Sequence, residues 1–586
     1  MTNKTFRIGI CMAGAVSAGA YTAGVMDYIM EALSEWEKRK GQPNVPSHKV
    51  VIPIMGGASA GGMTSLLTAS TINNEIKPVP LPNKANLLDE HPENKLYHSW
   101  VDLTEKDMFL KMLDPSDISS GNVVSLLNSN FIDDIAVKMI QSDIKKWKAA
   151  PPFFEMPVKV FTTLSNLNGF NYNTDFNGGI RKEKYNMAVH NDYACFELFD
   201  ENTQTPLTLG WMPLNFKTGD FIKTARDAAM ATGAFPVGLK SRILERDSSY
   251  VNAIPWLKDI FQNSPVTENP LKTLNVDGGM INNEPFEKVR YLLDEITIKQ
   301  RNSEYNTLNK DEKQEFLNEI NSLYKNFENT VLMIDPFPSL DKTEDFNYSQ
   351  NLTNIISETF SAMTAQMRAK PINYRSAMEQ DDASQFIISP SRKREDIDGT
   401  FKDFFGEKAI ACGTMGGFGG FLNKEFRIHD YFLGKYNCEM FLRKYFTIPE
   451  EALLANPIFS EGYSGVDKSK YAVVGADGKR SYPIIPIFKP EAAPDTFPIP
   501  TFSCGGNWPK VSENFINGYE KPVKNRAEKI ILNIVKLSST TLFLLKVGSF
   551  AILNKIIWKK VASSIKNSLY KSNLISNYSP NREETY

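Results

Sequence analysis

Ser59, in the run Gly57-Ala58-Ser59-Ala60-Gly61, is the residue of this sequence best suited to act as a nucleophile. The run is a G-x-S-x-G pattern, in which a serine on a sharp strand-to-helix turn holds its hydroxyl above the sheet edge. Only small residues fit two positions either side of such a serine, because a side chain would clash in the tight, strained turn. The apolar Val-Val-Ile-Pro-Ile-Met before it and Met-Thr-Ser-Leu-Leu after it are the expected strand and helix. We therefore predict Ser59 as the nucleophile and Gly57 and Gly61 as the elbow around it.

A second loop of small residues, Ala13-Gly14-Ala15-Val16-Ser17-Ala18-Gly19, follows an apolar run near the N-terminus. Consecutive small residues between a strand and a helix leave backbone N–H groups open to a developing negative charge. The loop carries neither the Gly-Lys-Ser/Thr of a P-loop nor a G-x-G-x-x-G dinucleotide pattern. We predict an oxyanion hole formed by the N–H groups of Gly14, Ala15, Val16 and Ala60. Taken alone, the loop is also consistent with a plain tight turn.

Asp277, in Val276-Asp277-Gly278-Gly279, is the predicted general base for the serine. Four of the five histidines lie in polar stretches, where a surface position is expected: His48, His91, His98 and His190. The fifth, His429, precedes Asp430, but adjacent residues do not face one another on a helix. A carboxylate can serve as base when its pKa and geometry suit. An aspartate at a strand end, followed by glycines that permit close approach, is the best candidate.

The elements that must position these residues are short apolar runs that alternate with helical segments. Residues 8–26 and 50–74 carry no charge and are long enough to span a bilayer. Both are rich in glycine, so each predicts a buried strand, a glycine loop and a helix instead. Further buried strands are predicted at residues 158–163, 273–276 and 330–334. Strands interleaved with helices predict an α/β fold with a mostly parallel central sheet flanked by helices.

The order of these patterns along the chain predicts three parts. Residues 1–345 are predicted to form a catalytic domain with a proline-marked, helical insertion at 78–151. Within this domain, residues 303–326 are predicted to form one charged helix that is exposed to solvent. Residues 346–520 form an extension packed on the core, and 521–586 form a basic C-terminal tail. Within the extension, three segments stand out: a helical stretch at 347–370, a glycine-dense stretch at 411–421 and a proline-rich strap at 483–509.

The composition is that of a globular protein and excludes several classes of function. The 586 residues are 42% hydrophobic and 23% charged, with 35 glycines and 33 prolines. A net charge of −2 gives no global basic footprint for nucleic acid. The five cysteines are odd in number and lack CxxC spacing, which indicates reduced thiols and neither a metal site nor a disulfide framework. We expect no metal, no cofactor and a cytoplasmic protein that is soluble or peripheral to a membrane.

In their order along the chain, the glycine loop, the G-x-S-x-G pattern and the Asp-Gly-Gly resemble the patatin-like phospholipases, which use a Ser-Asp dyad. An alanine-rich segment ending in Phe-Pro, residues 225–236, is a fourth match. The resemblance covers roughly residues 6–340, and residues 416–443 resemble an extension of larger bacterial members. It implies a patatin-like fold and a serine carboxylic-ester hydrolase of the phospholipase A or lysophospholipase type. Ser59 would form a covalent acyl-enzyme with a phospholipid or another fatty-acyl ester, Asp277 would move the proton, and no cofactor is implied.

The loop departs from the family's usual Gly-Gly-Gly-x-Arg/Lys-Gly, because Ala15, Val16 and Ala18 replace two glycines and the cation. Loss of one oxyanion contributor typically costs about 2.7–4 kcal/mol of transition-state stabilisation. One alternative is therefore a catalytically weak or inactive patatin fold that serves as a membrane or protein interaction module. A second alternative is a Ser-His-Asp hydrolase that uses His429.

The tail segment 526–571 carries nine lysines and arginines against the single Glu528. Its apolar stretches, 537–545 and 547–554, are too short to span a bilayer, and Gly548 favours two helices over one. Excess lysine beside large apolar residues is typical of a segment that contacts an anionic membrane surface. A helical pair packed on the core is an equal alternative, because the lysines do not share one clean helical face.

Overall fold

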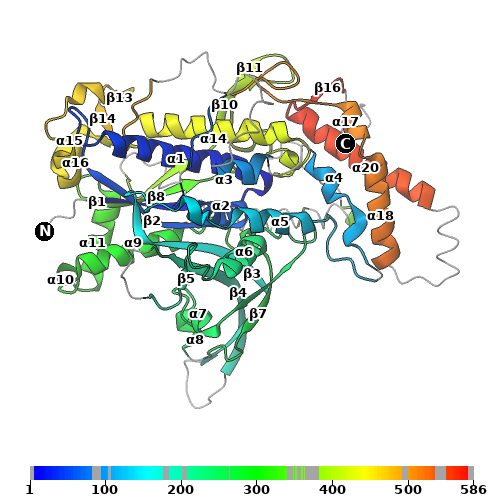
Figure 1. Ribbon diagram of the computed structural model, residues 1–586, viewed down its shortest axis with the longest axis horizontal. Helices are drawn as coiled ribbons and strands as arrows, with labels where there is room; N and C mark the ends of the chain where they lie inside the picture. Colours follow the sequence, from blue (N-terminus) through cyan, green and yellow to red (C-terminus); the bar gives the residue numbers. More distant parts are fainter. Residues whose placement is uncertain are drawn as a thin grey trace.

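The computed structural model describes residues 5–74, 76–81, 94–102, 107–119, 121–175, 184–200, 207–262, 264–338, 382–490, 499–534 and 550–578, with isolated residues between 348 and 362 (Figure 1). Its centre is a nine-stranded sheet in the order β5-β4-β3-β2-β1-β8-β9, with β6 and β7 joined through β3. Its strands are β1 Thr5–Met12, β2 Lys49–Gly57, β3 Phe154–Asp175, β4 Lys184–Leu198, β5 Met212–Leu214, β6 Arg242–Arg246, β7 Leu271–Asp277, β8 Asn329–Ile334 and β9 Gln385–Ile388.

The sheet is mostly parallel around its centre, as predicted. β1 pairs in parallel with both β2 and β8, while β2 pairs with β3 and β8 with β9 in the same sense. β3 is far longer than the predicted 158–163, because its length serves three partners: β2, and the antiparallel β4 and β7. The predicted strands at 273–276 and 330–334 are β7 and β8.

Helices cover both faces of the sheet, because alternate residues of each strand point to opposite sides. On one face, Ile10 and Met12 belong to the cluster that contains α1 (Gly19–Arg39), α2 (Ser59–Ala69) and α14 (Lys424–Lys444). On the other face, Cys11 packs in a cluster with Val289 and Leu293 of α9 (Phe286–Gln300). Figure 1 shows α1 and α14 side by side along one layer of the molecule. The two glycine-rich segments near the N-terminus are thus strand, loop and helix, as predicted.

The insertion and the segments after it supply short helices, of which α3 and α6 contact α2. Its elements are α3 Lys95–Tyr97, a π-helical turn His98–Asp102, α4 Met108–Met112, 3-10 turns Pro115–Asp117 and Ile144–Lys146, and α5 Asn130–Met139. The following helices are α6 Ile222–Thr232, α7 Ser248–Asn252 and α8 Lys258–Phe261. The single helix predicted at 303–326 is wrong: α10 (Asn302–Tyr305) and α11 (Lys310–Ser322) are separate. Asn309 starts α11 anew with a capping box, in which its side chain accepts from the N–H of Glu312.

The extension packs against α1 through α14. Gly24 and Gly434 bring the two backbones together, since a Cβ on Gly24 would lie 2.0 Å from the carbonyl oxygen of Tyr431. Lys435 of α14 bonds Asp27 of α1 at 2.7 Å. The other elements are hairpin β10 Ser391–Glu395 with β11 Phe401–Phe405, a small sheet of β12 Thr447–Pro449, β13 Val473–Val474 and β14 Arg480–Pro483, and helices α15 Glu450–Ala455 and α16 Pro457–Gly462. The helix predicted at 347–370 lies outside the described residues except for isolated positions between 348 and 362.

The described residues of the tail include the helices α18 (Glu520–Ile534) and α20 (Phe550–Lys571), and the break predicted around Gly548 lies outside the described residues. They are preceded by β15 (Val511–Ser512) and α17 (Glu513–Asn517), and β16 (Ile575–Ser576) pairs with β15. Ile565 and Leu569 of α20 are buried in the main apolar cluster, so this helix is part of the packed body. Among the helices that the structure describes, none combines the length and apolar content required to cross a membrane.

Candidate active site

Ser59 stands on a strained turn between β2 and α2, with a φ of +50° in the left-handed region. The glycines on either side are required by the neighbouring strand. A Cβ on Gly61 would lie 2.2 Å from the carbonyl oxygen of Met12, and one on Gly57 would lie 2.6 Å from the same atom. Only glycine therefore permits this approach of the elbow to the end of β1. The geometry has the form expected of a nucleophile elbow.

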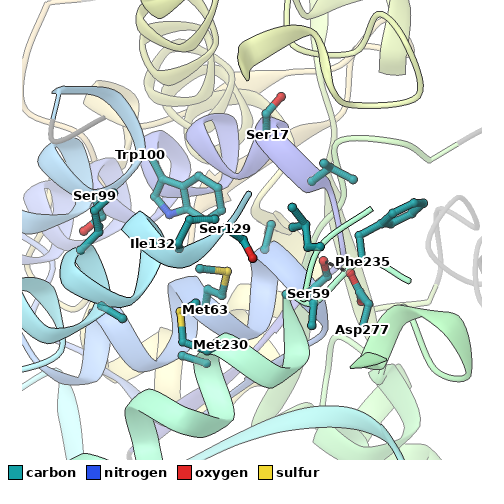
Figure 2. Close-up of a pocket in the computed structure, with 18 of the residues that line it drawn as sticks. Ser17, Ser59, Met63, Ser99, Trp100, Ser129, Ile132, Met230, Phe235 and Asp277 are labelled. Atoms are coloured by element: carbon teal, nitrogen blue, oxygen red, sulfur yellow. Dashed lines mark hydrogen bonds between the residues drawn. The ribbon is translucent and has the colours of Figure 1, made fainter. Parts of the chain in front are cut away.

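Asp277 is the last residue of β7, and its side chain points toward that of Ser59 (Figure 2). The Ser59 hydroxyl donates to Oδ2 of Asp277 at 2.6 Å, while Oδ1 accepts the N–H of Gly279 at 2.8 Å. Both side chains are almost fully buried, with the residues 6% and 5% exposed. The antiparallel pairing of β7 with β3 places Asp277 opposite Leu164 and next to the elbow. The structure thus brings together two predicted residues that are 218 positions apart.

Three further residues hold this pair in place and were not predicted. The N–H of Ser59 donates to the hydroxyl of Thr232 at 2.8 Å, at the end of the alanine-rich helix α6. The hydroxyl of Ser165 donates to the carbonyl oxygen of Asp277 at 2.8 Å, and the N–H of Asp277 donates to the carbonyl of Ala234. Short hydroxyl side chains are common throughout the sequence, so nothing in the pattern distinguished Thr232 or Ser165.

The loop predicted as an oxyanion hole lies directly beside Ser59. A Cβ on Gly14 would be 3.1 Å from the Cβ of Ser59, so a larger residue there would press on the nucleophile. The N–H of Gly14, predicted as an oxyanion donor, instead donates to the carbonyl of Asn283 at 3.3 Å. Val16 and Ala60, two of the other predicted donors, line the same cavity as Ser59. Ala15 is buried at the start of this turn. The N–H of Ala60 belongs to the first turn of α2, where no intrahelical acceptor exists.

The cavity next to the dyad is narrow and apolar, with a volume of about 110 Å³. Figure 2 shows Met63 and Met230 beyond Ser59, and Trp100 and Ser99 at the opposite side from the dyad. The wall comes from α2, α6, the insertion and the extension: its apolar members include Leu67, Met108, Ile132, Ile135, Met139, Ile140, Phe235, Leu239 and Phe421. Three cationic side chains, Lys240, Arg242 and Arg427, also line it. A chamber lined in this way suits an apolar ligand.

The four histidines that the structure describes do not line this cavity. His429 is buried in the extension, where Nδ1 lies 2.6 Å from Oδ1 of Asp430 and Nε2 contacts Arg392. The expectation that His429 and Asp430 cannot meet is wrong, because the ring reaches along its own helix. Burial, reinforced by Arg392, lowers the pKa of His429 well below its ordinary value. Of the described residues that line the cavity, none is a histidine.

Two other histidines correct the expectation of surface positions. His48 is 4% exposed and stacks on Tyr463, and burial lowers its pKa to about 4. His98 is 9% exposed and contacts Asp102. Each lies in a polar stretch of sequence, but the local pattern does not show that a distant segment covers it. His190 bonds the carbonyl of Asn166, and His91 lies outside the described residues.

Comparison with known proteins finds a match over the part of the chain that contains Ser59 and Asp277. A family model described as "Patatin-like phospholipase" matches residues 10–290. An uncharacterised protein, y4iI, of Sinorhizobium fredii (strain NBRC 101917 / NGR234) is 30% identical over 613 aligned residues. The alignment covers 95% of this chain and 81% of that relative, so the similarity extends through the extension and the tail.

Proposed function

The chain belongs to the patatin-like phospholipase family, and we propose that it cleaves fatty-acyl esters of phospholipids or lysophospholipids with Ser59 as nucleophile and Asp277 as base. The single observation that carries this proposal is the 2.6 Å hydrogen bond from the Ser59 hydroxyl to Asp277 on a strained nucleophile elbow. The elbow, the base and the adjoining apolar cavity are the three parts that acyl transfer from a lipid ester needs.

The reaction proceeds through two acyl transfers. Ser59 Oγ attacks the ester carbonyl carbon while Asp277 takes the hydroxyl proton. The tetrahedral oxyanion that forms is stabilised by the backbone N–H groups of Val16 and Ala60. The intermediate collapses, and the departing alcohol leaves with the proton from Asp277. Water then attacks the acyl-enzyme, gives its proton to the same carboxylate and releases the fatty acid, after which Ser59 regains its proton.

Fatty-acid release from a panel of phospholipids and lysophospholipids tests this function directly. The wild type is expected to release fatty acid and to be labelled covalently at Ser59 by a fluorophosphonate. Ser59→Ala protein serves as the blank. Absence of both release and labelling in folded wild-type protein would favour the alternative, an inactive patatin fold that acts as an interaction module, for which the missing loop cation is the only support.

Trp100 is expected to limit the length of the acyl chain, because it lies on the far side of the cavity from Ser59 (Figure 2). Its ring packs on the start of α1, 2.3 Å from where a Cβ on Gly19 would lie. Trp100→Ala should shift the preference among soluble acyl esters toward longer chains. Burial of each CH₂ group that enters the freed space stabilises the bound ester by about 0.8 kcal/mol, which corresponds to a roughly 4-fold higher relative rate.

The measurement is the ratio of kcat/KM for long and short acyl esters in the wild type, Trp100→Ala and the matched Trp100→Phe. The phenylalanine variant keeps most of the ring volume and should retain the wild-type profile. An unchanged ratio in a folded Trp100→Ala protein would show that the acyl chain does not extend toward this side of the cavity.

We also propose that exposed lysines of α20 contact an anionic membrane surface. Lys555, Lys559 and Lys560 are exposed beside the half-exposed Ile556, whereas the buried side of the helix packs on the body. Each basic residue near an anionic membrane surface contributes about 1 kcal/mol to the free energy of membrane binding. Charge reversal of these three lysines to glutamate should therefore weaken binding to phosphatidylglycerol-containing vesicles by about 100-fold or more. The melting temperature and the hydrolysis of a soluble ester should stay unchanged.

The matched control reverses three exposed lysines on the region around α9 and α11: Lys299, Lys310 and Lys325. An equal loss of vesicle binding in both triple variants would mean that net charge alone, and not this face of α20, governs adsorption.

A further inference from the structure

We infer that the C-terminal extension completes the active site, with Ser17 as a positioning residue that ties the oxyanion loop to residues 411–421, called here the glycine segment. The inference rests on the proposed function, because it assigns a role in stabilising the oxyanion of that reaction. The glycine segment lies beyond the 10–290 range that the family model matches.

Ser17 makes three hydrogen bonds to the glycine segment. Its N–H donates to the carbonyl of Gly417 at 3.0 Å, and its hydroxyl donates to the same carbonyl. The hydroxyl in turn accepts the N–H of Gly420 at 3.0 Å. Ser17 is 1% exposed, so these bonds are shielded from water. A Cβ on Gly420 would lie 2.9 Å from the Cβ of Ser17, which leaves room only for glycine at this contact.

The residue next to Ser17 is held in a conformation that it would not adopt alone. Val16 has a φ of +48°, a left-handed conformation that is unfavourable for a β-branched residue. Gly417, itself at a φ of +94°, packs against it, with its Cβ position 3.1 Å from the Cβ of Val16. Strain of this kind persists only where the surroundings enforce it, and it is concentrated at functional sites. Here the surroundings are the glycine segment, and the enforced residue lines the cavity beside Ser59.

The glycine segment is fixed in turn by α14. The two carboxylate oxygens of Asp430 accept the N–H groups of Ala411 and Cys412, each at 2.8 Å. Arg427 donates to the carbonyl of Gly420 and lines the cavity with Ser59. A continuous chain of hydrogen bonds therefore leads from the Arg427 guanidinium through Gly420 to Ser17 and the oxyanion loop.

This arrangement offers a structural reason for the unusual loop sequence. The family's loop carries a cation where this chain has Ala18, and Ala18 is fully buried. The loop, with Val16 and Ala18 in place of glycine and the cation, is held from outside by the glycine segment, which it contacts through Ser17. The cation closest to it in this hydrogen-bond chain is Arg427, which comes from the extension.

Ser17→Ala tests the inference on the full-length protein. We expect kcat for a soluble acyl ester to fall by about 10- to 100-fold, somewhat less than removal of an oxyanion donor itself, with KM unchanged. Affinity for a trifluoromethyl ketone, whose adduct with Ser59 carries the oxyanion, should fall by a similar factor. Affinity for a non-hydrolysable ether analogue should not change. A merely structural role would not separate these two ligands.

Thr330→Val is the matched control, because Thr330 is also fully buried and its hydroxyl donates to the carbonyl of Ala383 at 2.8 Å, outside the cavity. It should lower the melting temperature without changing kcat. If Ser17→Ala does not fold, Ser17→Cys, which keeps a weak donor at the same position, should lower kcat by less than the 10- to 100-fold expected for the alanine variant. Wild-type kcat and ketone affinity in whichever variant folds would overturn the inference while leaving the proposed function intact. Wild-type protein that hydrolyses no ester would overturn both.

Discussion

Ser59→Ala is expected to reduce kcat/KM for acyl esters by about 10⁴-fold or more, because it removes the atom that forms the acyl-enzyme. Covalent labelling by a fluorophosphonate should disappear with it. The melting temperature should change little, since alanine and serine meet the same backbone strain at a φ of +50° and no apolar contact is lost. Ester hydrolysis and thermal unfolding of the purified variant check both parts of this expectation.

Asp277→Asn completes the same prediction. The amide oxygen can still accept the N–H of Gly279, so the geometry should survive, but an amide cannot take the Ser59 proton. We expect a loss of about 10³- to 10⁴-fold in kcat.

Ser65→Ala controls for both substitutions, because this hydroxyl is equally buried on α2 and bonds the carbonyl of Gly61 at 3.0 Å without lining the cavity. It should retain wild-type turnover. The dyad assignment fails if folded Ser59→Ala or Asp277→Asn protein turns over at a rate close to that of the wild type. A His429 variant that loses all activity while remaining folded would instead support a triad.

Truncation after Lys521 is expected to unfold the protein or to lower its melting temperature by well over 10 °C. Arg526 of α18 is 2% exposed and forms a buried ion pair with Asp117 at 2.8 Å. Removing one partner of such a pair costs about 3–5 kcal/mol, because the other charge stays buried without compensation. Loss of Leu569 and Leu574, both fully buried, adds about 1.5–3 kcal/mol each. The sum approaches the whole stability of a typical domain, about 5–15 kcal/mol.

Thermal unfolding of the truncated protein, followed by circular dichroism, measures this effect. The matched control is truncation after Tyr578, which removes only residues 579–586 and should leave the transition in place. Arg526→Gln in the full chain should reproduce part of the loss. A truncated protein with a wild-type melting temperature and weakened vesicle binding would show instead that the tail is a separable membrane anchor.

The sequence alone indicated the local parts of the candidate site. Gly57 and Gly61 mark the elbow because their spacing around Ser59 is recognisable within five residues, although the atom that excludes their side chains, the carbonyl oxygen of Met12, lies on β1. The strands before and after it follow from short apolar runs in the same way. The glycines after Asp277 are likewise visible in the sequence, but the reason for them is a distant strand: a Cβ on Gly278 would lie 2.1 Å from the carbonyl oxygen of Thr163 on β3.

Only the tertiary structure decided which distant residues meet. The bond between Ser59 and Asp277 depends on β3, which pairs with β2 in one part and with β7 in another, and this pairing leaves no pattern in either strand. The burial of His48, the link from Ser17 to Gly417 and the position of Arg526 arise from segments that are hundreds of residues apart. Hydrophobic periodicity shows that a residue is buried, but not against what. Contacts over such separations are therefore set by the packing of the whole chain.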